Sequence, residues 1–316
     1  MNARSCGSTL HGLTPTLTPF DVSLRRAGRA PLTRLLAGVA ILVVSACRPG
    51  PAAAPREMLA PKPGAAQPTA VDPVPVHDTF SVQSRILGEV RAVNVWTPPG
   101  YDPSATTRWP VLYMPDGGID EDFPHVVNTV DSLLKRDAIR PVIVVGIPNT
   151  QRRRDLTGPT TVKADSAIAP KVGGSAAFRA FIRDELIPAV DARYRTTGER
   201  AIIGESLAGL FVLETFFTEP SLFTHYASLD PSLWWNDEAL AKSVGPDLAR
   251  MDAAPRTLYI VTANYAPTIA AAERIASGLR AASPPHLRWS YVPRPDLTHA
   301  TIFRGVQADA LRRLLR

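Results

Sequence analysis

The strongest chemical signal in the sequence is a serine placed between a short apolar run and a helical pattern. Residues 201–204 are apolar and end at Gly204, and Ser206 follows two residues later. In a strand–turn–helix context, the motif G-x-S-x-G presents a nucleophilic serine at the apex of a sharp turn. The match is imperfect, because Ala208 stands where the last glycine is usual and Gly209 comes one residue later. We interpret Ser206 as a nucleophile, with a simple helix cap as the alternative.

A serine hydroxyl becomes a good nucleophile when a base takes its proton. In this arrangement the chain order is serine, acid, histidine, so the base must follow Ser206. His225 is expected at the entry of a strand and His286 just before the last strand, on the opposite edge of the sheet. His299 lies between the last predicted strand and the last predicted helix, on the same edge as Ser206. We therefore predict that His299 is the base.

The sequence does not identify the acid that would orient the imidazole. It should follow the predicted strand 257–263, but Asn264 stands there and no carboxylate comes before Glu273. Asp296 lies three residues before His299 and could support it locally. Asp296, Glu273 and Asn264 are therefore equal candidates, and a Ser–His dyad without an acid is also compatible with the pattern.

Several residues are candidates for contact with a reacting carbonyl or with the rest of a substrate. Gly117 and Gly118 follow the predicted strand 110–114, and their backbone amides, with that of Leu207, are predicted to stabilise an oxyanion. A plain tight turn is the alternative for the glycine pair. Trp234 and Trp235 could form an aromatic wall for the substrate, and buried packing is the alternative. Arg154 could contact an anionic substrate, and a solvated basic loop is the alternative.

The elements that must position these residues form an alternating pattern. Short apolar or β-branched runs predict strands at 79–86, 90–96, 110–114, 141–147, 201–204, 226–229, 257–263 and 287–292. Helical periodicity predicts helices at 123–136, 175–194, 206–217, 237–250, 267–282 and 300–316. This order predicts an α/β fold with a mostly parallel central sheet, an N-terminal antiparallel hairpin and helices on both faces. Ligands are expected at the carboxyl ends of the strands.

The first 76 residues differ in character from the rest. Residues 1–46 combine a basic stretch with a short apolar run at 35–44, which is typical of a secretory signal peptide. The residues up to Cys47 resemble a bacterial lipobox, which implies cleavage before Cys47 and lipid attachment to it. Residues 47–76 are rich in Pro and Ala and are expected to form an extended tether. The predicted folded domain is 77–316, anchored by lipid in the bacterial cell envelope and facing the periplasm or the exterior.

Composition excludes several classes of site. Both cysteines, Cys6 and Cys47, precede the predicted domain, so that domain holds neither a disulfide nor a cysteine-ligated metal. The histidines lack metal-binding spacing, and the sequence requires no metal or cofactor. Of the formal charge of +6, residues 1–46 carry +4, because they hold five arginines and one aspartate. The remainder is too weakly basic for a strong nucleic-acid binder, so the expected partner is a small-molecule ester.

Residues 77–316 resemble the Putative esterase (esterase D-like) family of α/β-hydrolases, especially its siderophore-esterase-like branch. The similar stretches are 84–101, 110–117, 141–157, 184–188, 204–211 and 230–235. The resemblance implies an α/β-hydrolase fold and a serine carboxylic-ester hydrolase, with Ser206 as nucleophile, His299 as base and amides of Leu207 and the Gly117 region as oxyanion donors. Small esters, siderophore lactones among them, would be substrates.

The sequence departs from this family pattern at two places. Asp230 stands where serine is usual before Pro231, and Asn264 stands where a Gly-Glu-like turn often supplies the acid. Two other functions use the same residues or the same fold. An acyltransferase would need the same Ser–His site, and a binding protein on a degenerate hydrolase fold would explain Ala208 and Asn264.

Overall fold

The computed structural model describes residues 72–248 and 251–316. The predicted signal peptide, Cys47 and all but the last residues of the predicted tether lie outside this part of the chain. Within it, no helix is both long enough and apolar enough to span a bilayer.

A single mixed sheet runs through the described residues, with the strand order β1-β2-β4-β3-β5-β6-β7-β8. Its strands are β1 (Asp78–Ser84), β2 (Glu89–Trp96), β3 (Trp109–Pro115), β4 (Ile143–Ile147), β5 (Thr196–Glu205), β6 (His225–Leu229), β7 (Arg256–Thr262) and β8 (Leu287–Pro293). β1 and β2 form an antiparallel hairpin, β2 pairs antiparallel with β4, and every other pair is parallel. The predicted hairpin and parallel sheet are therefore confirmed.

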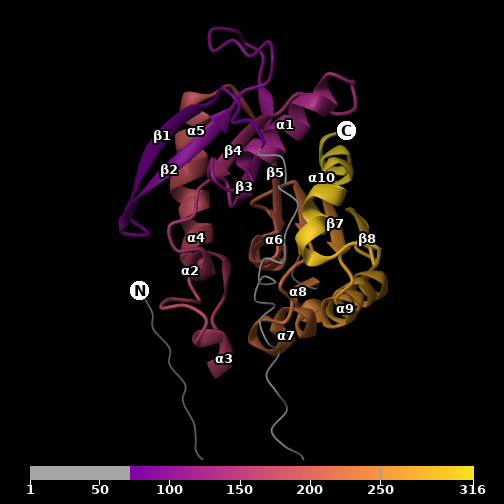
Figure 1. Cartoon of the computed structure of the whole chain (residues 1–316). Coiled ribbons are helices and arrows are strands. Elements are labelled where there is room, and N and C mark those ends of the chain that lie inside the picture. The colour runs from indigo at the N-terminus through magenta and orange to yellow at the C-terminus, as the bar shows by residue number, and fades with distance from the viewer. Residues whose placement is uncertain (1–71, 249–250) are drawn as a thin grey trace, which may run out of the picture. The chain divides into compact units, whose positions relative to one another are not determined.

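Helices cover both faces of this sheet (Figure 1). They are α1 (Phe123–Leu134), α2 (Arg152–Leu156), α3 (Lys163–Ser166), α4 (Ser175–Phe181), the π-helical turn η1 (Ile182–Leu186), α5 (Ile187–Arg193), α6 (Leu207–Thr218), α7 (Trp235–Lys242), α8 (Val244–Leu248), α9 (Ala266–Ala282) and α10 (His299–Leu315). α1 and α10 pack on one face, while α4 to α6, α8 and α9 pack on the other. Helices occur in all the predicted ranges, and 175–194 contains one π-helical turn. The range 237–250 is not a single helix, because α7 and α8 are separate and residues 236–238 of α7 have positive φ. The short helices α2 and α3 are additional to the predicted ones.

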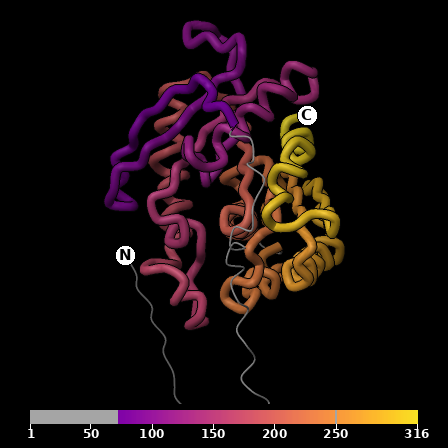
Figure 2. Tube along the Cα trace, in the orientation of Figure 1, coloured from indigo at the N-terminus to yellow at the C-terminus, as the bar shows by residue number. Residues whose placement is uncertain are grey.

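Alternation along the central strands explains the two cores. In β3, Leu112 and Met114 face α1 and α10, whereas Val111 and Tyr113 face the opposite helices. Every residue of β4 is buried, as expected for a parallel strand covered on both faces. In the chain trace of Figure 2, the β1–β2 hairpin lies at one edge of the sheet and the C-terminal elements lie at the other.

Parallel pairing brings three strand ends to the same edge of the sheet. β5, β6 and β7 are consecutive neighbours, and their carboxyl ends lead into Ser206, Asp230 and Ala263. α10 starts at His299, and the backbone amide of Asn264 donates to the carbonyl of Leu297, which ties the entry of α10 to this edge. The candidate nucleophile and the candidate base therefore share one edge.

The described end of the predicted tether lies on the folded domain. Asp72 pairs with Arg304 of α10 and lies 3.3 Å from His125 Nδ1 of α1. The side chain of Asn128 donates to the carbonyl of Pro73 at 2.8 Å. These contacts fasten residues 72–73 to the α1–α10 face.

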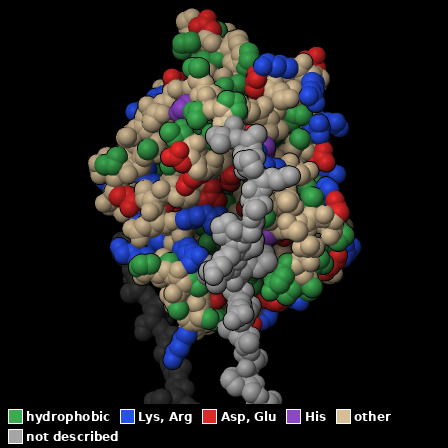
Figure 3. Space-filling view, in the orientation of Figure 1, with side chains coloured by type: hydrophobic (Ala, Val, Ile, Leu, Met, Phe, Trp, Pro, Cys, Tyr) green, Lys and Arg blue, Asp and Glu red, His purple; other side chains and the backbone are tan. Residues whose placement is uncertain are grey.

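Charged side chains of both signs are interspersed on the face seen in Figure 3.

The ion pair of Arg91 and Asp155 is buried. Arg91 of β2 binds Asp155 of α2 at 2.6 Å, and both side chains are at most 1% exposed. Glu89 and the carbonyl of Pro148 also accept from the same guanidinium. This pair connects β2 to the α2 segment that follows β4.

We expect Asp155→Ala to lower the free energy of unfolding by about 3–5 kcal/mol, because it leaves the Arg91 guanidinium buried without its nearest counter-charge. Urea denaturation followed by circular dichroism measures this change. Asp131→Ala is the matched control, because it removes an exposed i,i+4 pair with Lys135 and should hardly move the midpoint. Equal losses in the two variants would contradict the assignment.

Candidate active site

Ser206 occupies a strained turn between β5 and α6. Its backbone has φ 60° and ψ −120°, a conformation that side-chain-bearing residues rarely adopt. The turn is held by hydrogen bonds from the Ser206 amide to the carbonyl of Leu229 and from the Ser232 amide to the carbonyl of Ser206, both 3.0 Å. The hydroxyl lies 3.4 Å from that of Ser232. This is the strand–elbow–helix geometry that the sequence predicts.

The tight crossing of β5 and α6 explains the residues around the elbow. A Cβ on Gly204 would lie 2.7 Å from the backbone and the Cβ of Ala208. Glycine is therefore required at 204, and the space it leaves accommodates the methyl group of Ala208. A Cβ on Gly209 would lie 3.0 Å from the carbonyl oxygen of Leu229. The departure from G-x-S-x-G at Ala208 is thus compatible with an intact elbow.

His299 is the first residue of α10, and its ring is held by a carboxylate. Its Nδ1 lies 2.6 Å from Oδ2 of Asp230, whose side chain is 3% exposed. The other oxygen of Asp230, Oδ1, accepts from the Ala263 amide at 2.8 Å. The hydrogen bond from Nδ1 raises the pKa of His299 above its ordinary value, although burial opposes the shift. With Nδ1 donating to Asp230, Nε2 is left as the basic nitrogen.

None of the three candidates for the acid contacts this ring. Asp296 binds Arg294 and Glu273 binds Arg280, both at the exposed surface. The residue Asn264 is exposed, and its backbone amide donates a hydrogen bond to the carbonyl of Leu297. The carboxylate on His299 is Asp230, which directly follows β6, whereas Asn264 and Glu273 follow β7 and Asp296 follows β8.

The sequence carries a signal for Asp230 in its two departures from the family pattern. Asp230 is an acid where the family pattern has serine, and Asn264 lacks an acid where that pattern has one. Because the ends of β6 and β7 are adjacent, a carboxylate lost from one loop can be replaced from the other. Reading the two departures as one exchange would have found Asp230.

Further ionisable groups surround the histidine. Oε1 of Glu205 lies 3.6 Å from His299 Nδ1, and burial raises the pKa of Glu205 to about 7. Asp122, at the start of α1, also has its pKa raised by burial, to about 6. Arg152 counters these acids, and it holds Asp116 through two hydrogen bonds of 2.7 and 2.8 Å.

The glycine turn does not offer free amides in this conformation. The amide of Gly117 donates to the carbonyl of Ile147 at 3.1 Å, and that of Gly118 donates to Oε2 of Glu121 at 2.7 Å. A Cβ on Gly117 would lie 2.2 Å from the nitrogen of Ile147, so close backbone packing requires this glycine. Leu207 is the first residue of α6, where an amide has no intrahelical partner. Of the three predicted donors, Leu207 is therefore the one placed to act without rearrangement.

The predicted substrate contacts are largely occupied by the protein. Trp235 is buried and donates from Nε1 to the carbonyl of Gly158 at 2.9 Å, while Trp234 packs against it and is half-buried. Arg154 is bound by Glu89 and Asp155 at 2.7 and 2.6 Å and is 16% exposed. Trp235 and Arg154 thus have partners within the protein, which agrees with the alternative of buried packing for Trp235 and gives Arg154 a structural role. Their contact with a substrate stays a prediction.

The other candidate histidines lie elsewhere. His225 starts β6 and binds Glu199 at 2.7 Å, and His286 precedes β8, so both lie at the amino ends of strands. In the described part of the chain, no group of three His, Cys, Asp or Glu side chains is arranged to hold a metal ion.

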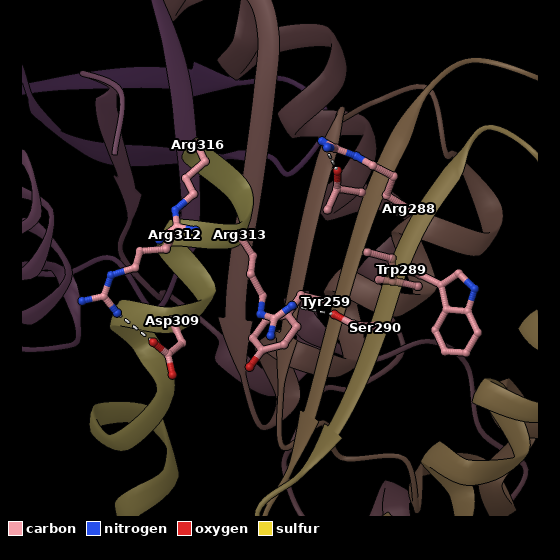
Figure 4. Close-up of a pocket in the computed structure, with 10 residues that line it drawn as sticks. Tyr259, Arg288, Trp289, Ser290, Asp309, Arg312, Arg313 and Arg316 are labelled. Carbon is pink, nitrogen blue, oxygen red and sulfur yellow. Dashed lines mark hydrogen bonds and ion pairs between the residues drawn. The ribbon is translucent and has the colours of Figure 1, made fainter. Parts of the chain in front are cut away.

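A cavity of about 570 Å³ lies near the C-terminal end of α10 (Figure 4). It is formed by the first halves of β7 and β8 and the last turns of α10, and its lining includes Tyr259, Arg288, Ser290, Arg312 and Arg313. Arg313 lies over the ring of Tyr259, with 4.7 Å between the guanidinium carbon and the ring centroid. The cavity contains no residue of the Ser206, His299 and Asp230 cluster.

We expect Asp230→Asn to lower the pKa of His299, because the imidazolium loses the anion and the hydrogen bond that stabilise it. The titration of the His299 ring Cε1 proton by NMR measures this pKa. Asp296→Asn is the control, and it should leave the His299 titration unchanged. A shift in the control and none in Asp230→Asn would assign the acid to Asp296, in the loop between β8 and α10.

Comparison with known proteins places the fold and the family. Residues 84–259 match the model of the family described as Putative esterase. The ferri-bacillibactin esterase BesA of Bacillus subtilis is 28% identical over 168 residues, which cover 49% of this chain and 58% of BesA. The siderophore triacetylfusarinine C esterase of Aspergillus fumigatus is 30% identical over 188 residues, covering 54% of this chain and 60% of that protein. The chain thus spans somewhat over half the length of these curated relatives.

Solved structures agree with the α/β architecture. An IroE-like serine hydrolase from Shewanella oneidensis superposes with a TM-score of 0.69 and 26% identity, covering 76% of this chain and 80% of that one. The siderophore hydrolase EstB from Aspergillus nidulans superposes with a TM-score of 0.62 at 21% identity, covering 78% of this chain and 95% of EstB, and supports the fold. Since the matched family model covers more than half of the sequence, the chain belongs to the Putative esterase family of α/β-hydrolases.

Proposed function

We propose that the protein is a serine carboxylic-ester hydrolase that works through an acyl-enzyme. The observation that carries this proposal is an elbow serine on the same edge of the sheet as a histidine whose Nδ1 is held by a buried carboxylate. Two links connect the serine to the other two groups. The residue before Ser206 is Glu205, whose carboxylate lies 3.6 Å from His299 Nδ1. The carbonyl of Ser206 accepts a hydrogen bond from the amide of Ser232, which lies two residues after Asp230. Serine, histidine and acid thereby occupy one edge of the sheet in roles that hydrolases use repeatedly.

The reaction follows from these positions. Ser206 Oγ turns from Ser232 toward His299, attacks the ester carbonyl carbon and gives its proton to Nε2. Asp230 accepts the Nδ1 hydrogen bond throughout and stabilises the imidazolium. The Leu207 amide faces the developing oxyanion, where the positive end of α6 adds to the stabilisation. The ester C–O bond then breaks, and the leaving oxygen takes the proton from Nε2 and departs as an alcohol. Water attacks the acyl-enzyme after giving a proton to Nε2, Ser206 Oγ leaves and takes that proton back, and the carboxylic acid is released.

We infer that the substrates are small esters of the siderophore type. Two observations support this class: the named relatives are esterases of siderophores, and the family resemblance extends across the domain. Only part of each curated relative is matched, and a screen of ester substrates identifies the individual ester. Simple aryl esters suffice to test the chemistry because they report on the nucleophile and the base directly.

We expect Ser206→Ala to abolish hydrolysis of p-nitrophenyl acetate and labelling by a fluorophosphonate probe. His299→Ala and Asp230→Asn should lower kcat/KM by roughly 10²–10⁴-fold, since each removes part of the proton-transfer machinery. Ser221→Ala, which alters an exposed serine, is the control and should match the unmodified protein. Absence of labelling in the unmodified protein, under conditions that label a known esterase, would favour a non-catalytic binding role.

We also propose attachment to the bacterial cell envelope through a lipid on Cys47. The support is the basic and apolar segment before Cys47 and the proline-rich stretch that leads from it to the domain. The contacts of Asp72 and Pro73 with α1 and α10 fix where that stretch would reach the folded part.

We expect the full chain, expressed in a bacterium fed with radiolabelled or alkyne palmitate, to incorporate the label and to fractionate with membranes. Cys47→Ser removes the thiol that would accept the lipid and should abolish incorporation, while Cys6→Ser is the control and should not. Equal labelling of both variants would remove Cys47 as the attachment site.

A further inference from the structure

A second carboxylate lies beside the histidine and has no part in the triad. Glu205 ends β5, directly before the nucleophile, and its Oε1 is 3.6 Å from His299 Nδ1, at the distance of an ion pair rather than a hydrogen bond. Its side chain is 17% exposed. The Nδ1 proton is already directed to Asp230 at 2.6 Å, so one side of the imidazole faces two carboxylates.

The charges around Glu205 come from four segments. His299 belongs to α10, Asp230 follows β6, Arg152 lies on α2, and Asp122 precedes α1. Asp230 and Asp122 repel the ionised form of Glu205, whereas His299 and Arg152 attract it. Arg152 is itself engaged by Asp116 through two hydrogen bonds. The variable partner of Glu205 is therefore His299, which becomes positive whenever it accepts a proton.

Resting on the hydrolase function proposed above, we propose that Glu205 is a positioning residue that stabilises the protonated state of His299 together with Asp230. While the imidazole is neutral, Glu205 gains little from it. When His299 takes the proton of Ser206, a positive charge appears 3.6 Å from the carboxylate. The ionised form of Glu205 is then favoured, and the ion pair lowers the energy of the charged intermediate.

Burial explains why the charge of Glu205 can change when His299 gains a proton. Because desolvation raises the pKa of Glu205 to about 7, its charge changes in the same pH range as that of the imidazole. Two groups of opposite charge that titrate together share their protons, so the pH dependence belongs to the pair. Asp230 differs from Glu205 in its contacts, because its two carboxylate oxygens accept hydrogen bonds from the Ala263 amide and from His299 Nδ1.

The first test measures His299 directly and needs no substrate. NMR titration of the His299 ring, assigned by its loss in His299→Asn, should give a lower pKa in Glu205→Gln, because glutamine keeps the shape and removes the charge. Glu205→Asp keeps the charge at a greater distance and should give an intermediate value. Glu273→Gln neutralises an exposed acid that pairs with Arg280, and it should give the value of the unmodified protein.

The second test uses the pH profile of p-nitrophenyl acetate hydrolysis. In Glu205→Gln the acid limb of kcat/KM should move to lower pH, and kcat should fall about three- to thirty-fold with KM unchanged, since the effect acts on the base and not on the substrate. Glu205→Asp should recover part of kcat. A purely structural role would leave the limb in place.

The two proposals fail in different ways. An unchanged His299 pKa in Glu205→Gln, with hydrolysis and Ser206 labelling intact, overturns the role of Glu205 alone. A lowered His299 pKa in a protein whose Ser206 is unreactive supports the Glu205–His299 coupling and overturns the hydrolase function.

Discussion

The arrangement of the site depends on the two oxygens of one buried carboxylate. Asp230 Oδ2 holds the His299 ring, and Oδ1 accepts from the backbone amide of Ala263, just beyond the end of β7. The amide of Asp230 donates to the carbonyl of Val261 at 2.7 Å. A single residue therefore fixes the loop after β6, the loop after β7 and the start of α10 against one another. The hydrogen bonds of Asp230 therefore orient the His299 ring and also hold these loops together.

Such a carboxylate is stable in the interior only because it is fully bonded. Desolvating an ionised group costs several kcal/mol unless hydrogen bonds and counter-charges replace the water. Asp230 has two strong donors, and Arg152 offsets the other acids near the site by binding Asp116 and facing Glu205. Glu205 has no comparable donor and responds to burial with a raised pKa. The two acids on His299 thus behave differently for a reason that lies in their hydrogen bonds.

The nucleophile depends on strain as well as on charge. Positive φ at Ser206 and at Asp230 costs of order 1–3 kcal/mol each, and the cost persists only where the surroundings determine the backbone. Both residues lie at the end of a strand buried in the sheet, and backbone hydrogen bonds hold them in place. The absence of a side chain at Gly204 allows α6 to approach β5 closely, because a Cβ there would lie 2.7 Å from Ala208. Rigid strands, rather than the loops, position the reacting groups.

The sequence by itself determined the periodicity-based features: the strands and helices, the mostly parallel sheet, the elbow at Ser206 and the edge on which His299 lies. These follow from local patterns and from the rule that consecutive parallel strands end on one side. Only the tertiary structure decided the acid, because Asp230 and His299 are far apart in the chain and meet through the β6–β7 pairing. It also decided that Gly117, Gly118, Arg154 and Trp235 are bound by the protein itself, since hydrogen-bond partners depend on segments that sequence spacing does not bring together.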